Sequence, residues 1–336
     1  MQSFSIGVDL GGTNMRVAAI EDTGRQLETV CASAAVNRGR DSVIAEMCNI
    51  IREIAGKFTR SHKFAGVGVG VPGVIDMDTG TVFAAANLPG WTNYPVKDEI
   101  QKQLGTAVIL ENDSNCAALG EKWMGVGREA NGLCMVTLGT GVGGAFIFNG
   151  TLWHGMLGMA GEIGHMTVTP DGPSCGCGNR GCLEQFASAT AIKRMAEEAV
   201  ARGKFPELAS AMAANPDASA KVVFQYALHG DAAAREIFVT VGWALGVVIS
   251  SLVDALNLPV YAIGGGVSSA WDVFSPALFQ ELRKRSIVFR ASDPEKSQLH
   301  QKKTIVTRAL LASDAGLIGA ARLPLLSEDS LVLRTA

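Results

Sequence analysis

The chain has 336 residues, of which 48% are hydrophobic, and a formal net charge of −3 at pH 7. That length and apolar content favour a large buried core, divided between two domains rather than held in one. The slightly acidic charge and the 6% content of aromatic residues disfavour nucleic acid as a partner, because such a partner requires basic surfaces and stacking rings.

The N-terminal residues and the cysteine count indicate a soluble, cytoplasmic protein. Residues 1–13 contain no basic region followed by an apolar stretch, as a secretory signal would. The longest apolar run, Val241 to Val253, is too short to cross a bilayer. Seven cysteines, an odd number, disfavour a disulfide framework. Four of them stand in apolar contexts and are expected to be buried thiols: Cys31, Cys48, Cys116 and Cys134.

The first third of the chain alternates apolar runs with glycine turns. Residues 5–9 are an apolar run that ends in Asp9, and a second run covers residues 15–20 after Gly11 and Gly12, which predicts strand, turn and strand. The spacing of apolar residues predicts a helix over 41–60. Further along, the pattern predicts strands at 67–71 and 108–110 and a helix over 114–124, begun by an Asp-Ser cap.

The middle of the chain repeats the opening pattern. A strand at 133–138, a glycine turn at 139–144 and a strand at 145–148 reproduce the arrangement of residues 5–20, which suggests a duplicated α/β fold. A long buried helix is expected over 232–256, followed by a strand at 260–263 and by helices near 270–288 and 309–322.

The first glycine turn has the residues of a phosphate-binding loop. Glycines let backbone N–H groups approach an anion, and Thr13 adds a hydroxyl donor beside Gly11 and Gly12. Asp9 could hold a hydrated Mg²⁺ next to the phosphates. A plain β-hairpin is the alternative, since paired glycines also suit primed turns.

Two further glycine clusters extend this pattern. The second, Leu138 to Gly144, holds four glycines and Thr140, of which a hairpin explains only two; the expected phosphate ligands are Gly139, Thr140, Gly141 and Gly143. The third follows a buried strand, and its Gly265 and Gly266 could lie flat against a base or ribose or simply lead into a helix. None of the clusters is a P-loop, and none matches a dinucleotide fingerprint after the first strand.

The tripeptide Glu111-Asn112-Asp113 lies where a strand meets a helix, a common position for ligand contacts in α/β sheets. Asp113 could be a helix N-cap or the general base for a sugar hydroxyl, with Asn112 holding neighbouring hydroxyls. Phosphoryl transfer needs positioning, charge neutralisation and one proton acceptor, so a single carboxylate meets its demand.

The pattern with the strongest chemical signature is a histidine followed by three cysteines. His165, Cys175, Cys177 and Cys182 are the ligand types of a closed, tetrahedral, structural zinc site, and intervening glycines allow a tight loop. Chance clustering or a redox pair are the alternatives, but Cys-x-Cys is not the Cys-x-x-Cys of redox proteins.

Three isolated polar residues are weaker candidates for contacts with sugar hydroxyls. Glu162 and Glu184 flank the cysteine loop, and each could equally be a solvated acid. Asn87 precedes Leu-Pro-Gly-Trp, where a turn-forming role is the alternative.

Taken together, these motifs resemble those of the ROK family of repressors, uncharacterised reading frames and sugar kinases. The resemblance covers about residues 5–320, with the motifs in the same order, and rests on these segments: residues 9–13, 111–113, 138–144, 161–165 and 175–182. The His-plus-three-Cys block is specific to that family, whereas the glycine turns are shared with the wider actin and hexokinase-like fold.

The resemblance implies a two-lobed, actin/hexokinase-like α/β fold with a cleft between the lobes. Its small lobe would comprise residues 1–118 plus 309–325, the last helix packing back on it, and its large lobe residues 119–308 with the zinc loop. It implies a hexose kinase of carbohydrate metabolism and glycolysis that uses Mg²⁺ and ATP, with Asp113 as the base. The implied sugar ligands are Asn87, Asn112, Asp113, Glu162, His165 and Glu184.

The resemblance also implies that His165 binds zinc with one ring nitrogen and faces the sugar with the other. Homodimers and homotetramers are common in the family, and residues 182–190 look most like glucokinases. The alternatives are kinases of N-acetylmannosamine, N-acetylglucosamine, fructose or allose, and enzymes that use polyphosphate. A sugar-responsive repressor is disfavoured because Asp9 leaves no room for a preceding helix-turn-helix domain.

Overall fold

The computed structural model describes residues 1–85, 87–203, 209–210, 220–298 and 301–326. The chain divides into two compact units. Unit 1 comprises residues 1–135, 145–161 and the segment from Ser313 onward, and unit 2 comprises residues 136–144 and 162–312. The lobes expected from the sequence were divided at 118/119 and 308/309, so residues 119–135 and 145–161, expected in the large lobe, lie in unit 1. The assignment of lobes stays a prediction.

Unit 1 is built on a five-stranded sheet of order β3-β2-β1-β4-β7. The first three strands are antiparallel, and β1, β4 and β7 run parallel, so their carboxyl ends share one edge. The strands of the sheet, and of a separate two-stranded hairpin formed by β5 and β6, are β1 (Ser3–Leu10), β2 (Asn14–Glu21), β3 (Gln26–Ser33), β4 (Lys63–Val71), β5 (Val74–Asp76), β6 (Thr81–Ala84) and β7 (Val108–Asn112).

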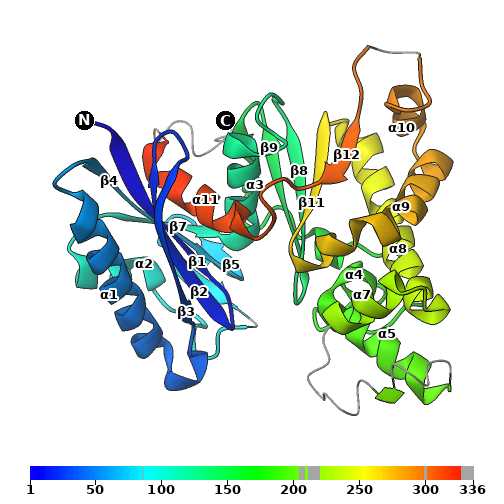
Figure 1. The fold of residues 1–336 in the computed structure, drawn as a ribbon, viewed down its shortest axis with the longest axis horizontal. Coiled ribbons are helices and arrows are strands. Elements are labelled where there is room, and N and C mark those ends of the chain that lie inside the picture. The colour runs from blue at the N-terminus through cyan, green and yellow to red at the C-terminus, as the bar shows by residue number, and fades with distance from the viewer. Residues whose placement is uncertain (86, 204–208, 211–219, 299–300, 327–336) are drawn as a thin grey trace. The chain divides into compact units, whose positions relative to one another are not determined.

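Helices cover both faces of this sheet (Figure 1). On one face lie α1 (Arg40–Phe58) and α2 (Val96–Leu104), and on the other α3 (Asp113–Met124) and α11 (Ala315–Arg322). The apolar positions that predicted the first helix are its buried side: Val43, Ile44, Met47, Ile50, Ile51 and Ile54. Each such side chain stabilises the fold by roughly 1.5–3 kcal/mol relative to an exposed one.

The helix α11 returns from the far end of the chain to the first strand. A Cβ at Gly7 would overlap the carbonyl oxygen of Leu317, and one at Gly68 would overlap that of Ala320. These two glycines are neighbours on β1 and β4, so the sheet offers a flat backbone surface to the helix. The expected return of the last helix to the N-terminal sheet is therefore present within unit 1.

A second five-stranded sheet has the order β10-β9-β8-β11-β12. Numbered by their own sequence order, its strands follow the same 3-2-1-4-5 arrangement as the first sheet, which supports the duplicated α/β fold. Its strands are β8 (Leu133–Leu138), β9 (Val142–Phe148), β10 (Thr151–Leu152), β11 (Val260–Gly264) and β12 (Ile305–Arg308).

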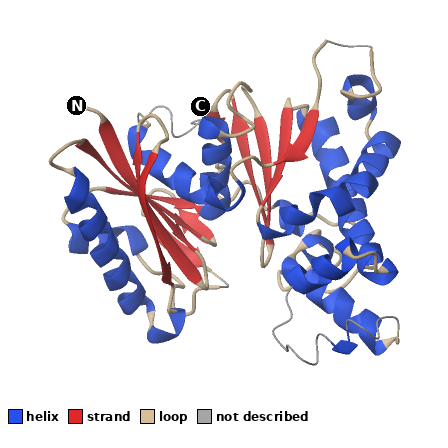
Figure 2. Ribbon diagram, viewed as in Figure 1, coloured by secondary structure: helices blue, strands red, loops and turns tan. Residues whose placement is uncertain are grey.

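The helices of unit 2 gather around α8 (Ala232–Leu256), which packs along α9 (Trp271–Arg285). Figure 2 shows this predominance of helix beside the second sheet. In the described part of the chain, α8 alone has the length and apolarity of a membrane span, but 67% of its apolar window is buried, as in a core helix. The other helices are α4 (Glu184–Ala187), α5 (Ala189–Ala201), α7 (Ala220–Leu228) and α10 (Ile287–Ser292).

Short 3₁₀ helices complete the described secondary structure. They lie at Val36–Arg38, Ile163–His165, Gly266–Ala270, Ala312–Asp314 and Leu323–Leu325.

The structure corrects several details of the sequence reading. The helix expected over 270–288 breaks at Ser286, because the hydroxyl of Ser286 accepts the N–H of Phe289 and caps a new helix. Residues 309–314 precede α11 rather than belonging to it, and the strand β12 was not anticipated. Cys31 is exposed rather than buried, because it lies on the outward side of the edge strand β3.

Candidate functional site

The first glycine turn joins β1 to β2 in unit 1. The N–H of Gly11 donates to the carbonyl oxygen of Asn14 at 2.8 Å, and Thr13 is exposed. A Cβ at Gly12 would lie 2.9 Å from the carbonyl oxygen of Asn87, so only glycine fits there. The turn is thus closed as a hairpin and also brings Asn87, a predicted sugar ligand, beside the predicted phosphate loop.

Asp9 ends the first strand and lies in register with Gly70 and, through it, with Glu111. Burial raises the pKa of Asp9, the guanidinium of Arg16 opposes this, and the carboxylate of Asp314 adds to it. Arg16 is held in turn by Asp314 Oδ1 at 2.5 Å and by the carbonyl oxygen of Ser313 at 2.7 Å. A cation beside Asp9 would stabilise its ionised form, which is the behaviour expected of a magnesium ligand.

The helix α3 is capped by Asn112, and not by Asp113. The amide oxygen of Asn112 accepts the N–H groups of Ser114 and Asn115 at 2.8 and 3.2 Å, and its Nδ2 donates to the carbonyl oxygen of Gly73 at 3.1 Å. The alternative that Asp113 is the N-cap is therefore wrong, because the N-cap is the preceding residue, Asn112. The amide oxygen of Asn112 is already engaged, so its remaining N–H is the group left for a ligand.

Asp113 stands at the first position of α3, where its Oδ1 accepts the N–H of Ser114 at 2.7 Å. Burial, together with the carboxylate of Asp9, raises the pKa of Asp113 to about 6. Asp9 and Asp113 thus come together from two parallel strand ends. A general base works best when its pKa lies near the pH at which the enzyme operates. A buried carboxyl group with a pKa of about 6 meets this condition at neutral pH.

A buried ion pair lies directly behind this position. Glu111 Oε1 accepts from the backbone N–H of Asn112 and from Asn115 Nδ2, both at 2.8 Å, and Glu111 Oε2 lies 2.7 Å from His154 Nε2. Burial lowers the pKa of His154, but the hydrogen bond and charge of Glu111 outweigh it, so the net shift is upward. Within the described residues His154 Nδ1 has no partner. The pair fixes the strand end from which Asn112 and Asp113 project, and sequence reasoning missed His154.

Glu111→Gln is expected to lower the free energy of unfolding by about 3 kcal/mol, the scale for breaking a buried ion pair. Because the pKa of His154 is raised in the folded protein, the stabilisation is complete below about pH 6.5 and fades as pH rises through the folded pKa. Urea unfolding at about pH 6 and about pH 9 measures this difference. The exposed Glu129→Gln is the control, and an equal loss at both pH values would contradict an ionic contribution of the pair.

The second and third glycine turns lie together in unit 2. Gly139, Thr140 and Gly266 line a pocket of about 480 Å³. Gly265 has φ +82°, and a Cβ there would overlap the carbonyl of Leu138, so the third turn packs directly on the strand that leads to the second. Gly143 belongs to β9 and not to the turn. Its contact with a phosphate stays a prediction.

The rest of this pocket comes from helices that carry no recognisable motif. Its apolar wall includes Ile192, Phe224 and Phe238, and its polar groups include Lys221 and Gln225. An apolar slot next to exposed glycine backbone suits a flat base with its attached phosphates. Sequence reasoning missed these residues; the only signal was the helical spacing of residues 221, 224 and 225.

Glu184 supports the second glycine turn. Its Oε2 accepts the N–H of Val142 at 3.0 Å, and a Cβ at Gly141 would overlap the same carboxylate. A side chain at position 141 would therefore displace the Glu184 carboxylate from this contact. The contact of Glu184 with a sugar stays a prediction, and one of its carboxylate oxygens already accepts the hydrogen bond from Val142.

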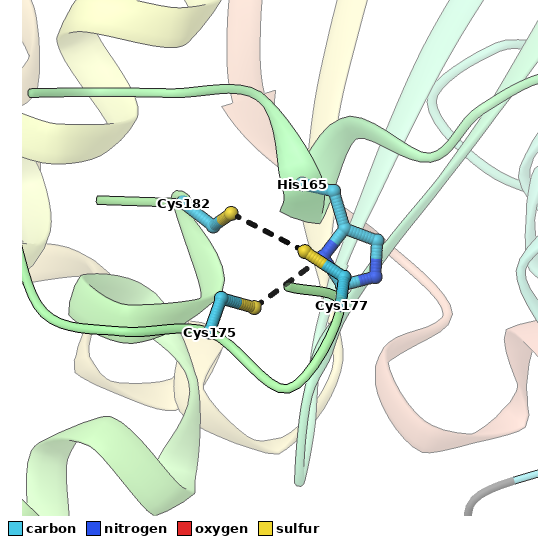
Figure 3. A group of neighbouring side chains, drawn as sticks. All are labelled: His165, Cys175, Cys177 and Cys182. Carbon is cyan, nitrogen blue, oxygen red and sulfur yellow. Dashed lines mark hydrogen bonds between the residues drawn. The ribbon is translucent and has the colours of Figure 1, made fainter. Parts of the chain in front are cut away.

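The four predicted metal ligands converge in the zinc loop (Figure 3). Their ligand atoms all lie within 4.8 Å of one another. Cys175 Sγ lies 3.7 Å from His165 Nδ1, and Cys177 Sγ lies 3.7 Å from Cys182 Sγ. Zinc–sulfur bonds of about 2.3 Å give tetrahedral edges of about 3.8 Å, so the donor set fits zinc. Burial raises the pKa of Cys182 to about 12, so a bound cation would be needed to ionise it.

The outer nitrogen of His165 faces away from the sulfurs. His165 Nε2 lies 3.8 Å from Glu162 Oε2, and Glu162 is exposed. Nδ1 thus lies on the side of the sulfurs and Nε2 on the side of Glu162. Binding of a metal by Nδ1 and of a sugar by Nε2, which the resemblance implies, stays a prediction. His165 and Glu162 are thus the two predicted sugar ligands that unit 2 brings together beside the metal cluster.

Comparisons with known proteins agree on one family. Residues 5–325 match the ROK family. The chain is 37% identical to the glucokinase of Halalkalibacterium halodurans, over 97% of this chain and 96% of that one. It is 38% identical to the glucokinase of Thermotoga maritima, over 94% and 95% of the two chains.

A solved structure agrees with these relatives. The structure of a ROK family glucokinase from Streptomyces griseus, in complex with glucose and AMPPNP, is similar with a TM-score of 0.77. Its sequence is 30% identical to this one, and the alignment covers 95% of this chain and 98% of that one. The α/β fold with its duplicated sheet and the group of one histidine and three cysteines agree with that assignment, and this chain belongs to the ROK family.

Proposed function

We propose that this chain transfers the γ-phosphoryl group of ATP to a hexose, with glucose as the preferred substrate and glucose 6-phosphate as the product. The observation that carries the proposal is the position of Asp113, a carboxyl group with a pKa of about 6 beside Asp9. The similarity to glucokinases over nearly the whole chain supports the choice of sugar.

In this proposal Asp113 accepts the proton of the attacking sugar hydroxyl. The hydroxyl oxygen forms a bond to the γ-phosphorus, the bond between that phosphorus and the β–γ bridging oxygen breaks, and ADP leaves with the electron pair. The Ser114 N–H and the Asn112 cap hold the Asp113 carboxylate in one orientation. The proposed sugar ligands are Asn87, Asn112 and Asp113 from unit 1, with Glu162, His165 and Glu184 from unit 2.

The pocket of unit 2 would hold the nucleotide. The proposed phosphate ligands are Gly139, Thr140, Gly141, Gly143, Gly265 and Gly266. The Gly139 N–H donates to the carbonyl oxygen of Gly141 at 2.9 Å and closes the turn, so the other backbone N–H groups would serve the phosphates. The turn of unit 1, with Gly11, Gly12 and Thr13, would serve the transferred phosphoryl group. When bound, Mg²⁺ neutralises phosphate charge, and Asp9 is the residue that would hold it, directly or through water.

The metal cluster would be a structural zinc site. His165, Cys175, Cys177 and Cys182 provide the complete ligand set, so no position is left open for a reacting group. Its proposed task is to hold His165 and Glu162 in place for the sugar. We further propose a cytoplasmic enzyme at the start of glycolysis that assembles as a homodimer or homotetramer.

A panel of sugars tests the substrate. With Mg·ATP, glucose is expected to give a higher kcat/KM than N-acetylmannosamine, N-acetylglucosamine or fructose, measured by coupled ADP release. Polyphosphate in place of ATP is expected to support no turnover, since the apolar slot suits a base. Faster turnover of an N-acetylated sugar would overturn the choice of glucose alone. No sugar-dependent ADP release from any of them would overturn the kinase and favour the sugar-responsive repressor.

A further inference from the structure

Asp9 and Arg16 are direct cross-strand neighbours that do not pair with each other. The antiparallel register of β1 and β2 sets them opposite one another, on one face of the sheet. Opposite charges in this arrangement ordinarily attract one another and form an ion pair. Among the described residues, however, the ion pair of Arg16 is with Asp314, and no hydrogen bond reaches the carboxylate of Asp9. The part-buried carboxylate of Asp9 therefore stays available to a ligand.

The guanidinium of Arg16 is anchored instead at the start of α11. One terminal nitrogen donates to the carbonyl oxygen of Ser313 at 2.7 Å, and the other donates to Asp314 Oδ1 at 2.5 Å. The donors of a guanidinium form a rigid planar fork, so two bonds to one short segment fix the direction of the side chain. The fork of Arg16 thus points to residues 313–314 and not to its cross-strand neighbour.

Asp314 holds this arginine although its position in the helix favours another task. It is the N-cap residue of α11, where an aspartate side chain commonly accepts a backbone N–H of the first turn. Here the side chain makes no capping hydrogen bond. Its Oδ1 accepts instead from Arg16 and, at 3.4 Å, from the hydroxyl of Ser313. The start of α11 does not depend on this carboxylate, so its main interaction is the pair with Arg16.

The same helix start also packs on Asp9. A Cβ at Gly316 would lie 3.3 Å from Oδ1 of Asp9, so this carboxylate rests directly on the backbone of the first turn of α11. Asp9 contacts Gly316, and Arg16 is bound to Asp314, two residues earlier. One short segment therefore fixes both charges and holds them apart.

We propose that Asp314 is a positioning residue for phosphoryl transfer: it holds the guanidinium of Arg16 away from Asp9, so that the Asp9 carboxylate stays available to Mg²⁺. This inference rests on the proposed function, in which Asp9 holds the Mg²⁺ that accompanies ATP. If Arg16 closed on Asp9, its N–H donors would occupy the carboxylate oxygens that a hard cation prefers as ligands. The apparent affinity for the metal would then fall with the fraction of molecules in which Asp9 is open.

Two other tasks of the Arg16–Asp314 pair would give different results. A pair that only ties α11 to the sheet would contribute to stability and leave the binding of metal unchanged. An arginine that binds a phosphate group itself would contribute to the affinity for the nucleotide both with and without metal. Measurements of nucleotide binding in the presence and absence of Mg²⁺ therefore separate the three roles.

Asp314→Ala tests the proposal by calorimetry with AMPPNP, in the presence of glucose and without turnover. The dissociation constant of Mg·AMPPNP is expected to rise about tenfold, because the released Arg16 closes on Asp9, and that of metal-free AMPPNP to stay within about twofold. The variant should fold, since Asp314 is 40% exposed and caps no N–H group. Glu28→Ala is the matched control and should leave both constants unchanged, because the 29% exposed Glu28 pairs with Lys57 at 2.6 Å.

Adding Arg16→Gln to Asp314→Ala is expected to restore the affinity for Mg·AMPPNP, because the side chain that closes on Asp9 is then gone. Unchanged binding of Mg·AMPPNP by Asp314→Ala would overturn the proposal and favour a structural tie. A double variant as weak as Asp314→Ala would overturn it and favour a phosphate contact of Arg16.

Glucose-dependent ADP release by the wild-type protein is measured in parallel. If the wild type is active and either contrary result is found, this role of Asp314 is excluded and the proposed kinase remains. If the wild type releases no ADP with glucose or any other sugar of the panel, the proposed function itself fails, and the inference fails with it.

Discussion

Asp113→Asn is expected to lower kcat by roughly a hundredfold or more, the scale for loss of a general base, in a protein that remains folded. The helix should not unravel, because Asn112 is its cap and the asparagine oxygen at 113 can still accept the N–H of Ser114. Burial disfavours the charge of Asp113, so the neutral amide should leave the thermal midpoint unchanged or raise it. The KM for ATP should change little, since no phosphate contact is assigned to this side chain.

The wild-type enzyme should show the matching pH dependence. Because the pKa of Asp113 is about 6, kcat is expected to fall about tenfold per pH unit below that value and to level off above it. Asp98→Asn is the control, since Asp98 is an exposed acid in the first turn of α2 and should leave kcat unchanged. An Asp113→Asn variant that keeps a third of the normal kcat would show that another group is the base.

Cys177→Ala is expected to release the zinc and to lower the thermal midpoint by about 5 °C or more. The wild-type protein, purified without chelator, should hold about one zinc per chain. Cys177 is an exposed ligand, so its truncation removes a metal bond without opening a cavity in the core. His165 Nε2 and Glu162, the proposed sugar ligands, lie on the side away from the sulfurs. Loss of the metal should release them, so the KM for glucose should rise more than the KM for ATP.

Arg180→Ala provides the control for the metal site. Arg180 lies in the same loop and bonds to Ser174 Oγ, but it offers no metal ligand. It should keep the zinc and most of the stability, as measured by elemental analysis and thermal unfolding. Wild-type protein without zinc would exclude the metal site, and a Cys177→Ala variant with unchanged zinc content would exclude this ligand set.

The sequence alone predicted those features that depend on short stretches of chain. The strand–turn–strand units needed only the local alternation of apolar residues with glycines, and the helix over 41–60 only its periodic apolar face. The metal ligands were equally accessible, because His165 and the three cysteines lie within eighteen residues and tight glycine turns leave the loop few ways to fold. The order of strands in each half could not be seen, although the repeat of the motif pointed to duplication.

Tertiary structure decided the features that depend on residues far apart in the chain. Asp9 raises the pKa of Asp113 only because parallel strands place their ends at one edge. The pairing of Glu111 with His154 spans 43 positions, and no local pattern announces it. Asn112 rather than Asp113 is the N-cap because of its backbone angles, which the sequence Glu111-Asn112-Asp113 does not determine. Local sequence determines which turns and helices can form, whereas desolvation and charge at a site are sums over neighbours that only the folded chain brings together.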